Sequence, residues 1–206
     1  MDVLGLNVER WGHNTFLLEG EKSVCIDPFK TPARPKKVDL VLVSHEHFDH
    51  CAPEKVREVA SERTAVAGHA GSAQKLRGIG AGFTPLQPGE SATLQGVRVE
   101  TLKAYNLNKW RSPGVPFHPP GSNHLGFVLH LKGLRVYYAG DTDFTDEMKA
   151  LRGVDIALLP VSGTYVMTAD EAAEAARHLK PRVAVPMHYG EIVGTAADAE
   201  RFRDLL

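Results

Sequence analysis

The chain has 206 residues, of which 43% are hydrophobic and 24% charged, a balance that allows a well-filled core in one compact domain over residues 1–206. The formal net charge of -1 gives no long-range field that favours nucleic acid or an anionic membrane, so we expect neither as a partner. Cys25 and Cys51 form no disulfide framework, the N-terminal segment differs from a signal sequence, and no apolar run approaches the roughly 20 residues that span a bilayer. These features favour a cytoplasmic protein.

Apolar alternation and β-branched residues predict ten strands, near residues 8–11, 14–19, 23–27, 39–44, 64–67, 97–103, 125–131, 134–139, 155–160 and 183–187. Helices are predicted near 53–61, 70–77, 145–151, 169–179 and 196–206. The helix at 169–179 has the clearest signals, because Thr168 and Glu171 form a capping box and Pro181 follows its end.

One structural unit occurs twice in the sequence. Residues 13–27 run from a histidine through a hairpin to an aspartate, and residues 124–141 follow the same plan. A buried strand follows each copy, at 38–43 and at 154–159. Any hairpin followed by a buried strand has a similar pattern, but the shared order and spacing favour a true repeat. Two sheets packed together with helices outside are the architecture that two such halves predict.

A dense group of potential metal ligands follows the apolar strand at 39–44, in the run His45-Glu46-His47-Phe48-Asp49-His50. Alternate residues of an extended segment share a face, so His45 and His47 can point the same way. Imidazole and carboxylate groups together suit zinc, manganese or iron better than calcium. A polar surface turn that happens to be rich in histidine is the plainer explanation, and three histidines with one aspartate in six residues argue against it.

Two single residues at strand ends extend this group. Asp141 ends the apolar strand at 134–139, and His188 ends the strand at 183–187. A lone aspartate there is usually a turn former and a lone histidine is usually structural. Because the cluster at 45–50 lies in the same chain, we expect both residues to be ligands.

The motifs HEHFDH at 45–50, AGDT at 139–142 and PMHYG at 186–190 resemble those of the metallo-β-lactamase superfamily. The resemblance extends over essentially the whole chain, and within the superfamily it is strongest to compact metal-dependent hydrolases that include the ascorbate-phosphate lactonases. It implies an α+β fold, a four-layer αββα sandwich of two similar halves. It also implies two divalent metal ions, one held by His45 and His47 and the other by Asp49, His50 and His188, with Asp141 between them.

The sequence departs from the family pattern at one expected ligand. The first metal site of the family takes a further histidine after the strand at 97–103, where this chain has Asn106. We expect His118 to be the substitute. For His13 and His124, which the repeat makes equivalent, we expect a supporting role at the hairpin entries, and for His69 exposure to solvent. Glu46 is expected to hold an imidazole, Cys51 to be a packing residue, and His130 and His178 to have no part in the site.

Residues 104–123 form the longest segment without regular periodicity, and such segments are often functional. Lys109 and Arg111 flank Trp110, which suggests a lid that binds a phosphate or carboxylate; a rigid packing loop with solvated basic residues is the alternative. Tyr165 is a further candidate for contact with the substrate.

The sequence therefore predicts a hydrolase that uses a metal-activated water on a small ester, lactone or phosphodiester, with zinc as the expected metal and manganese or iron as alternatives. Asp49 is the expected catalytic residue, because it can orient the water and accept its proton. The substrate is expected to be a small and possibly anionic molecule, and the oligomeric state is left open. An iron-dependent redox enzyme of the superfamily and a non-catalytic metal-binding module are the alternative functions.

Overall fold

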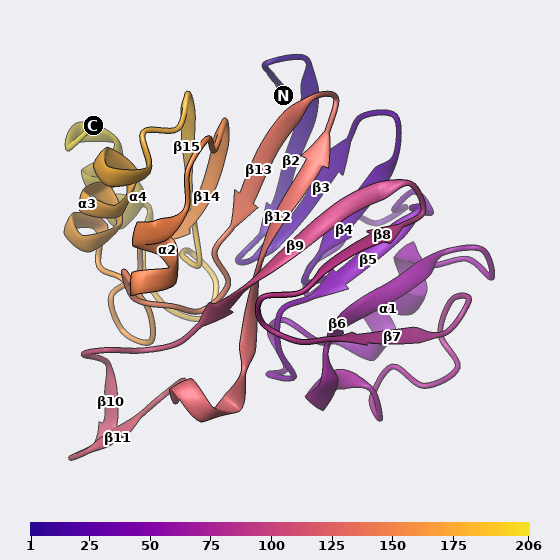
Figure 1. Cartoon of the computed structure of the whole chain (residues 1–206), viewed down its shortest axis with the longest axis horizontal. Helices are drawn as coiled ribbons and strands as arrows, with labels where there is room; N and C mark the ends of the chain where they lie inside the picture. The colour runs from indigo at the N-terminus through magenta and orange to yellow at the C-terminus, as the bar shows by residue number, and fades with distance from the viewer.

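The computed structural model describes all 206 residues, and its strands form two large sheets. The first sheet has the order β1 (Asp2–Val3), β2 (Leu6–Gly12), β3 (Thr15–Glu19), β4 (Ser23–Ile26), β5 (Leu40–Val43), β6 (Ala65–His69) and β7 (Phe83–Leu86). The second has the order β15 (Val183–Met187), β14 (Ile156–Pro160), β13 (Leu134–Tyr138), β12 (His124–Leu131), β9 (Val97–Ala104) and β8 (Ser91–Leu94). A small hairpin of β10 (Trp110–Ser112) and β11 (Val115–Pro116) extends from the body of the molecule (Figure 1).

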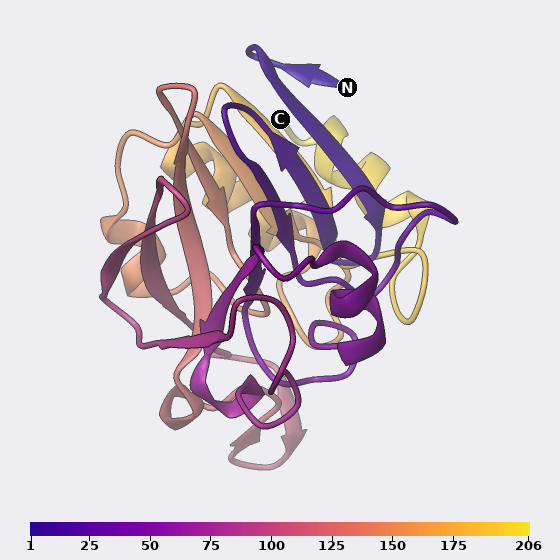
Figure 2. The same ribbon diagram turned by 90° about the vertical axis from the view of Figure 1, so that its right-hand side faces the viewer.

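The helices lie outside the two sheets, with α1 (Pro53–Val59) on one side and α2 (Asp146–Ala150), α3 (Ala169–Leu179) and α4 (Ala196–Asp204) on the other (Figures 1 and 2). α1 packs Val56 and Val59 against the outer face of the first sheet. α3 buries its alanine-rich face against the second sheet, and the predicted capping box at Thr168 and Glu171 is present. The predicted four-layer αββα sandwich is confirmed.

The internal repeat is visible in the strand pairing. In the first sheet β3 pairs antiparallel with β4, and β4, β5 and β6 then run parallel. In the second sheet β12 pairs antiparallel with β13, and β13, β14 and β15 then run parallel. Since parallel strands end at the same edge of a sheet, the residues that follow these strands gather at one edge of the sandwich.

Two predictions of local structure were wrong. Residues 70–77 form only a short 3-10 turn, η1 (Ala70–Ser72), followed by turns, because Gly71 lowers the helical propensity of a segment that has no cap. The prediction also omitted the short strands β1, β10 and β11 and the edge strands β7 and β8; β7 contains Pro85, a residue that sheets tolerate mainly at their edges. No helix in the structure combines the length and the apolar character needed to cross a membrane.

Candidate metal centre

The side chains predicted as metal ligands converge at the edge of the sandwich where the parallel strands of the two sheets end. His45 to His50 occupy the loop between β5 and α1, Asp141 follows β13, and His188 follows β15. His50 Nε2 lies 3.2 Å from Asp141 Oδ1 and 3.5 Å from Asp49 Oδ2, and His188 Nε2 lies 3.2 Å from Asp141 Oδ2. His45 Nε2 and His47 Nδ1 are 3.0 Å apart.

These separations fit a metal coordination sphere. Zinc binds nitrogen and oxygen at about 2.0–2.2 Å, so two ligand atoms that subtend angles of 90–120° lie roughly 2.9–3.7 Å apart. The donor set of neutral imidazoles and carboxylates also suits a first-row divalent metal. Geometry and chemistry therefore agree that these residues can hold metal.

Asp141 occupies the middle of the group. Its Oδ1 faces His50, whereas its Oδ2 faces His188 and lies 3.4 Å from His118 Nε2. The preceding Gly140 has φ +68°, and a Cβ there would lie 2.6 Å from the carbonyl oxygen of Leu125. Glycine is therefore required for β13 to approach β12 this closely while it directs Asp141 into the centre.

His50 is held in place by Asp27, which follows β4 in the first half as Asp141 follows β13 in the second. His50 Nδ1 donates to Asp27 Oδ2 at 2.6 Å, and Tyr138 and Ser44 also donate to this carboxylate. The bond fixes the ring so that Nε2 faces Asp141, Asp49 and the amide group of Asn14.

Burial and neighbouring charges favour the protonation states that metal ligands need at four of the proposed ligands, whereas at His50 burial alone would lower the pKa but Asp141, Asp49 and Asp27 hold it well above its ordinary value. Burial lowers the pKa of His118 to about 4 and holds the pKa of His45 and that of His47 below their ordinary value, which keeps these imidazoles neutral. Burial alone would raise the pKa of Asp141, but His188 and His50 hold it well below its usual range, so the carboxylate is ionised.

Known proteins resemble this chain over most of its length. The family model of the beta-lactamase superfamily domain matches residues 7–188. A UPF0173 metal-dependent hydrolase from Thermoplasma acidophilum is 35% identical over 204 residues, which cover 94% of this chain and 88% of the relative. The chain belongs to the metallo-β-lactamase superfamily. A second UPF0173 metal-dependent hydrolase, from Thermococcus kodakarensis, is 35% identical over an alignment of 218 residues. The match covers 98% of this chain and 92% of that relative.

Solved structures show that this superfamily member also shares its fold with known hydrolases. A protein assigned as a metal-dependent hydrolase from Parabacteroides distasonis has a TM-score of 0.82 and 32% identity, and the match covers 98% of this chain and 88% of that one. A metallo hydrolase from Ignicoccus hospitalis has a TM-score of 0.69 and 26% identity, over 90% and 83% of the two chains. The chain is a metal-dependent hydrolase of the superfamily.

Asn106 stands where the superfamily pattern predicts a histidine, and it holds His118. Its Oδ1 accepts hydrogen bonds from the main-chain N–H of His118 at 2.9 Å and from His118 Nδ1 at 3.0 Å. Its Nδ2 donates to the carbonyl oxygen of Tyr165, which fixes the orientation of the amide. His118 Nε2 therefore faces Asp141, close to the ring of His45 and that of His47.

Three histidines outside the predicted ligand set also lie at the centre. His13 Nε2 is 3.3 Å from Asp49 Oδ2, and its ring lies 4.3 Å from that of His188. The ring of His124 lies beside that of His45. His69 was predicted to be solvated, but it is buried and hydrogen-bonded to the carbonyl oxygen of Ser122. The expected solvation of His69 was wrong. The repeat was the signal that could have found His13 and His124, because equivalent positions in two halves meet at one edge.

The remaining residues that the sequence analysis considered for the site have other contacts in the structure. Cys51 is buried in the apolar cluster under α1, as expected. His130 pairs with Glu100, and His178 bonds to the carbonyl oxygen of Lys149, so both are engaged elsewhere. Glu46 contacts the imidazoles of His69 and His124 rather than those of the motif.

A cavity of about 320 Å³ opens over the metal centre, with lining residues His47, Phe48, Asp49, Arg111, Phe117, His118, Asp141, Tyr165 and Ile192. Arg111 and Tyr165 thus lie where the sequence predicted contact with substrate. Lys109 does not: its ammonium is 2.8 Å from Glu171 and 3.5 Å from Asp143. Lys109 is paired with these acids and is absent from the cavity lining, so its contact with substrate stays a prediction.

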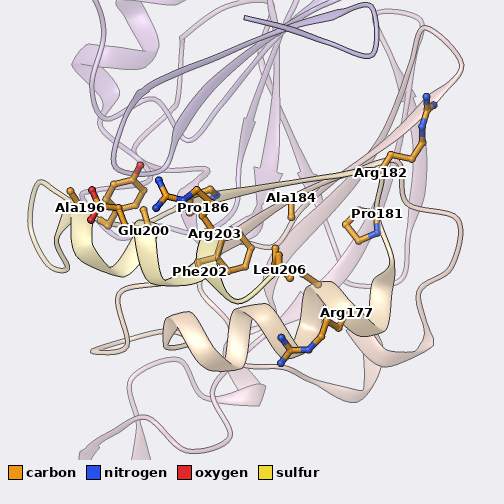
Figure 3. A pocket seen from close by; sticks show the side chains of 13 residues that line it. Arg177, Pro181, Arg182, Ala184, Pro186, Ala196, Glu200, Phe202, Arg203 and Leu206 are labelled. Atoms are coloured by element: carbon orange, nitrogen blue, oxygen red, sulfur yellow. The ribbon is translucent and has the colours of Figure 1, made fainter.

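A larger cavity, of about 720 Å³, lies elsewhere, between α3, α4 and β15 (Figure 3). Arginines and apolar side chains line it, among them Arg177, Arg203 and Phe202. It has one carboxylate, Glu200, and no histidine. The metal chemistry therefore belongs to the smaller cavity.

Proposed function

We propose that this chain hydrolyses a small ester, lactone or phosphodiester with two divalent metal ions. The proposed ligands are His45, His47 and His118 for the first ion, Asp49, His50 and His188 for the second, and Asp141 between them. The observation that carries this proposal is the position of Asp141, whose two carboxylate oxygens face different histidines of the group. Zinc is the proposed metal, with manganese or iron as the other metals that this donor set accepts.

Two divalent ions in such a centre lower the pKa of a bound water toward neutrality and polarise the bond to be cleaved. Asp49 is the proposed catalytic residue of the chain. Its carboxylate lines the cavity, and His50 and His13 contribute to keeping its pKa below the ordinary value although burial alone would raise it. An ionised carboxylate at this position can orient the attacking water and accept its proton.

The cavity suggests the class of substrate. Arg111 is the cationic side chain among its lining residues, and Phe117 and Tyr165 provide an aromatic wall in which the two rings lie 4.7 Å apart. A guanidinium recognises carboxylate or phosphate groups, and the aromatic wall favours an apolar body. We propose a small cytoplasmic substrate with an anionic group close to the bond that is cleaved.

A hydrolysis screen tests the proposal. The protein is stripped with a chelator, reloaded with Zn²⁺ or Mn²⁺, and assayed against matched esters, lactones and phosphodiesters. We expect activity in one class that the chelator abolishes and the metal restores, and a loss of at least 100-fold in Asp49→Asn and in His47→Ala.

His130→Ala is the matched control for these variants, since His130 pairs with Glu100 away from the centre. It should retain the activity of the natural chain. Full activity in His47→Ala, or activity that does not depend on added metal, would contradict the proposal.

A further inference from the structure

Glu46, His69 and His124 form a second cluster of ligand-type side chains, outside the set assigned to the two proposed ions. One donor atom from each lies within 4.8 Å of the other two. Glu46 Oε2 is 2.9 Å from His69 Nδ1 and 3.6 Å from His124 Nε2. These are the separations between neighbouring ligands around a first-row metal ion.

The polar atoms that face this cluster have no hydrogen-bond partner. Neither ring nitrogen of His124 makes a hydrogen bond although only 2% of the residue is exposed, and the buried atoms Glu46 Oε2 and His69 Nδ1, which lie 2.9 Å apart, make none either. Unpaired buried polar groups carry a free-energy cost, which a bound cation would offset. The nearby ammonium of Lys75 donates to the main-chain carbonyl of Glu46 and not to its carboxylate.

His69 is oriented in the manner of a metal ligand. Its Nε2 donates to the carbonyl oxygen of Ser122 at 2.8 Å, so Nδ1 is the ring nitrogen that faces Glu46. Metal-bound histidines commonly make such a bond with the second ring nitrogen. The contact between Nδ1 and Oε2 lacks the alignment of a hydrogen bond despite its short length.

The internal repeat relates this cluster to the pocket of His13, Asp49 and His188. His13 precedes β3 and His124 begins β12, the equivalent strand of the second sheet. His188 follows β15 and His69 ends β6, which are likewise equivalent. Exchange of the two halves therefore converts the pair His13–His188 into the pair His124–His69. Each pair flanks one carboxylate of the same loop, Asp49 in one case and Glu46 in the other.

The backbone leaves room beside the donor atoms. Gly71 lies in the turn η1, and a Cβ there would meet His69 Nδ1 and Glu46 Oε2 at 3.0 Å and His69 Cε1 at 2.8 Å. The side chain of Glu46 is 37% exposed, so the cluster borders solvent on one side although its donor atoms are themselves covered. An ion can enter there, and water can complete its coordination.

We propose that Glu46, His69 and His124 bind a further divalent cation, with zinc as the best match to one carboxylate and two imidazoles. This site lies beside the proposed pair of ions, because the ring of His124 stacks on that of His45 at 4.6 Å. It does not depend on the hydrolytic activity, since it rests on its own three residues.

Metal counting tests the site. The whole protein is stripped with a chelator, dialysed against excess Zn²⁺, freed of unbound metal, and analysed for zinc per chain by mass spectrometry. We expect His69→Ala and Gly71→Ala each to bind one zinc fewer than the natural chain. In crystals of the zinc-loaded protein, we expect an anomalous peak between Glu46 and His69 that both variants lack.

Matched variants separate this result from a general loss of structure. Gly121→Ala is the control for the glycine, because a Cβ there meets nothing within 4 Å, and His130→Ala is the control for the histidine. Both should bind as much zinc as the natural chain. If His69→Ala folds poorly, Glu46→Gln takes its place, because it preserves the shape of the side chain. Glu46→Gln should also bind one zinc fewer than the natural chain. Equal zinc in Gly71→Ala, Glu46→Gln and the natural chain, with no peak at Glu46, would overturn the proposal whether or not the enzyme is active.

Discussion

The side-chain oxygen of Asn106 accepts a hydrogen bond from Nδ1 of His118 at 3.0 Å, and a second one from the main-chain N–H of the same residue. This relationship accounts for the departure from the family motif. The asparagine is a poor ligand for zinc, but it is well suited to hold the proposed ligand His118, which follows twelve residues later along the chain.

Replacement of Asn106 by alanine should weaken metal binding in the pocket of His45, His47 and His118. His118 would lose two hydrogen bonds that orient its Nε2. Loss of such a supporting partner typically costs 10- to 100-fold in metal affinity, so we expect the weaker-binding zinc equivalent to shift by about that factor. Titration of the stripped protein with Zn²⁺ measures it. Asn108→Ala, which removes an amide that bonds only to Glu171 and Lys109, should show no shift, and an unchanged affinity in Asn106→Ala would contradict this role.

His13 should contribute to the pocket of Asp49 and His188. Its ring is fully buried, neither of its nitrogens makes a hydrogen bond, and Nε2 lies 3.3 Å from Asp49 Oδ2. We expect His13→Asn to reduce the affinity for one zinc equivalent by about 10-fold or more, with the far-ultraviolet circular dichroism unchanged. His178→Asn provides the comparison, since that histidine lies outside the site. Identical zinc titrations for the two variants would show that His13 has no part in the centre.

Arg111 should act on the affinity for substrate rather than on the chemical step. We consider a pair of substrates that differ by one carboxylate. Arg111→Gln should raise KM for the anionic substrate about tenfold, and it should leave kcat for both substrates and KM for the neutral one unchanged. Steady-state kinetics on both substrates measure this. Arg98→Gln, which removes an exposed arginine beside Glu100, should alter neither. A fall in kcat with KM unchanged would place Arg111 in the chemical step instead.

The sequence predicted the parts of the centre that depend on local pattern. The ligands at 45–50, Asp141 and His188 all follow apolar strands, so the chain itself shows that they emerge at strand ends. The same reasoning could not place His69 or Lys109. His69 meets Glu46 only because two sheets pack together, and Lys109 is neutralised by acids 34 and 62 residues away along the chain. The strands β7 and β8 escaped prediction because edge positions tolerate weak patterns.

The stability of the fold should depend on pH through Asp39, which immediately precedes β5. The main-chain N–H and hydroxyl of Ser23 and the ammonium of Lys22 donate to its carboxylate, which lowers the pKa of Asp39. A lowered pKa in the folded state gives stability that is present above the unfolded value, about 3.9, and lost as the pH falls through the folded value. We expect the free energy of unfolding of Asp39→Asn at pH 7 to be about 1 kcal/mol lower than that of the natural chain.

Urea unfolding at several pH values checks this expectation. The difference between Asp39→Asn and the natural chain should shrink as the pH falls below about 4. Asp146→Asn, at an aspartate that is largely exposed, should stay within about 0.5 kcal/mol of the natural chain. A difference for Asp39→Asn that is the same at pH 7 and at pH 3 would show that the charge of Asp39 is not its cause.

The central claim is that Asp141 joins two metal pockets, and anomalous diffraction from crystals of the zinc-loaded protein tests it most directly. We expect two peaks on either side of the Asp141 carboxylate, roughly 3.5–4 Å apart. One should lie within coordination distance of His45, His47 and His118, and the other of Asp49, His50 and His188. A single peak at Asp141, or none, would contradict the account.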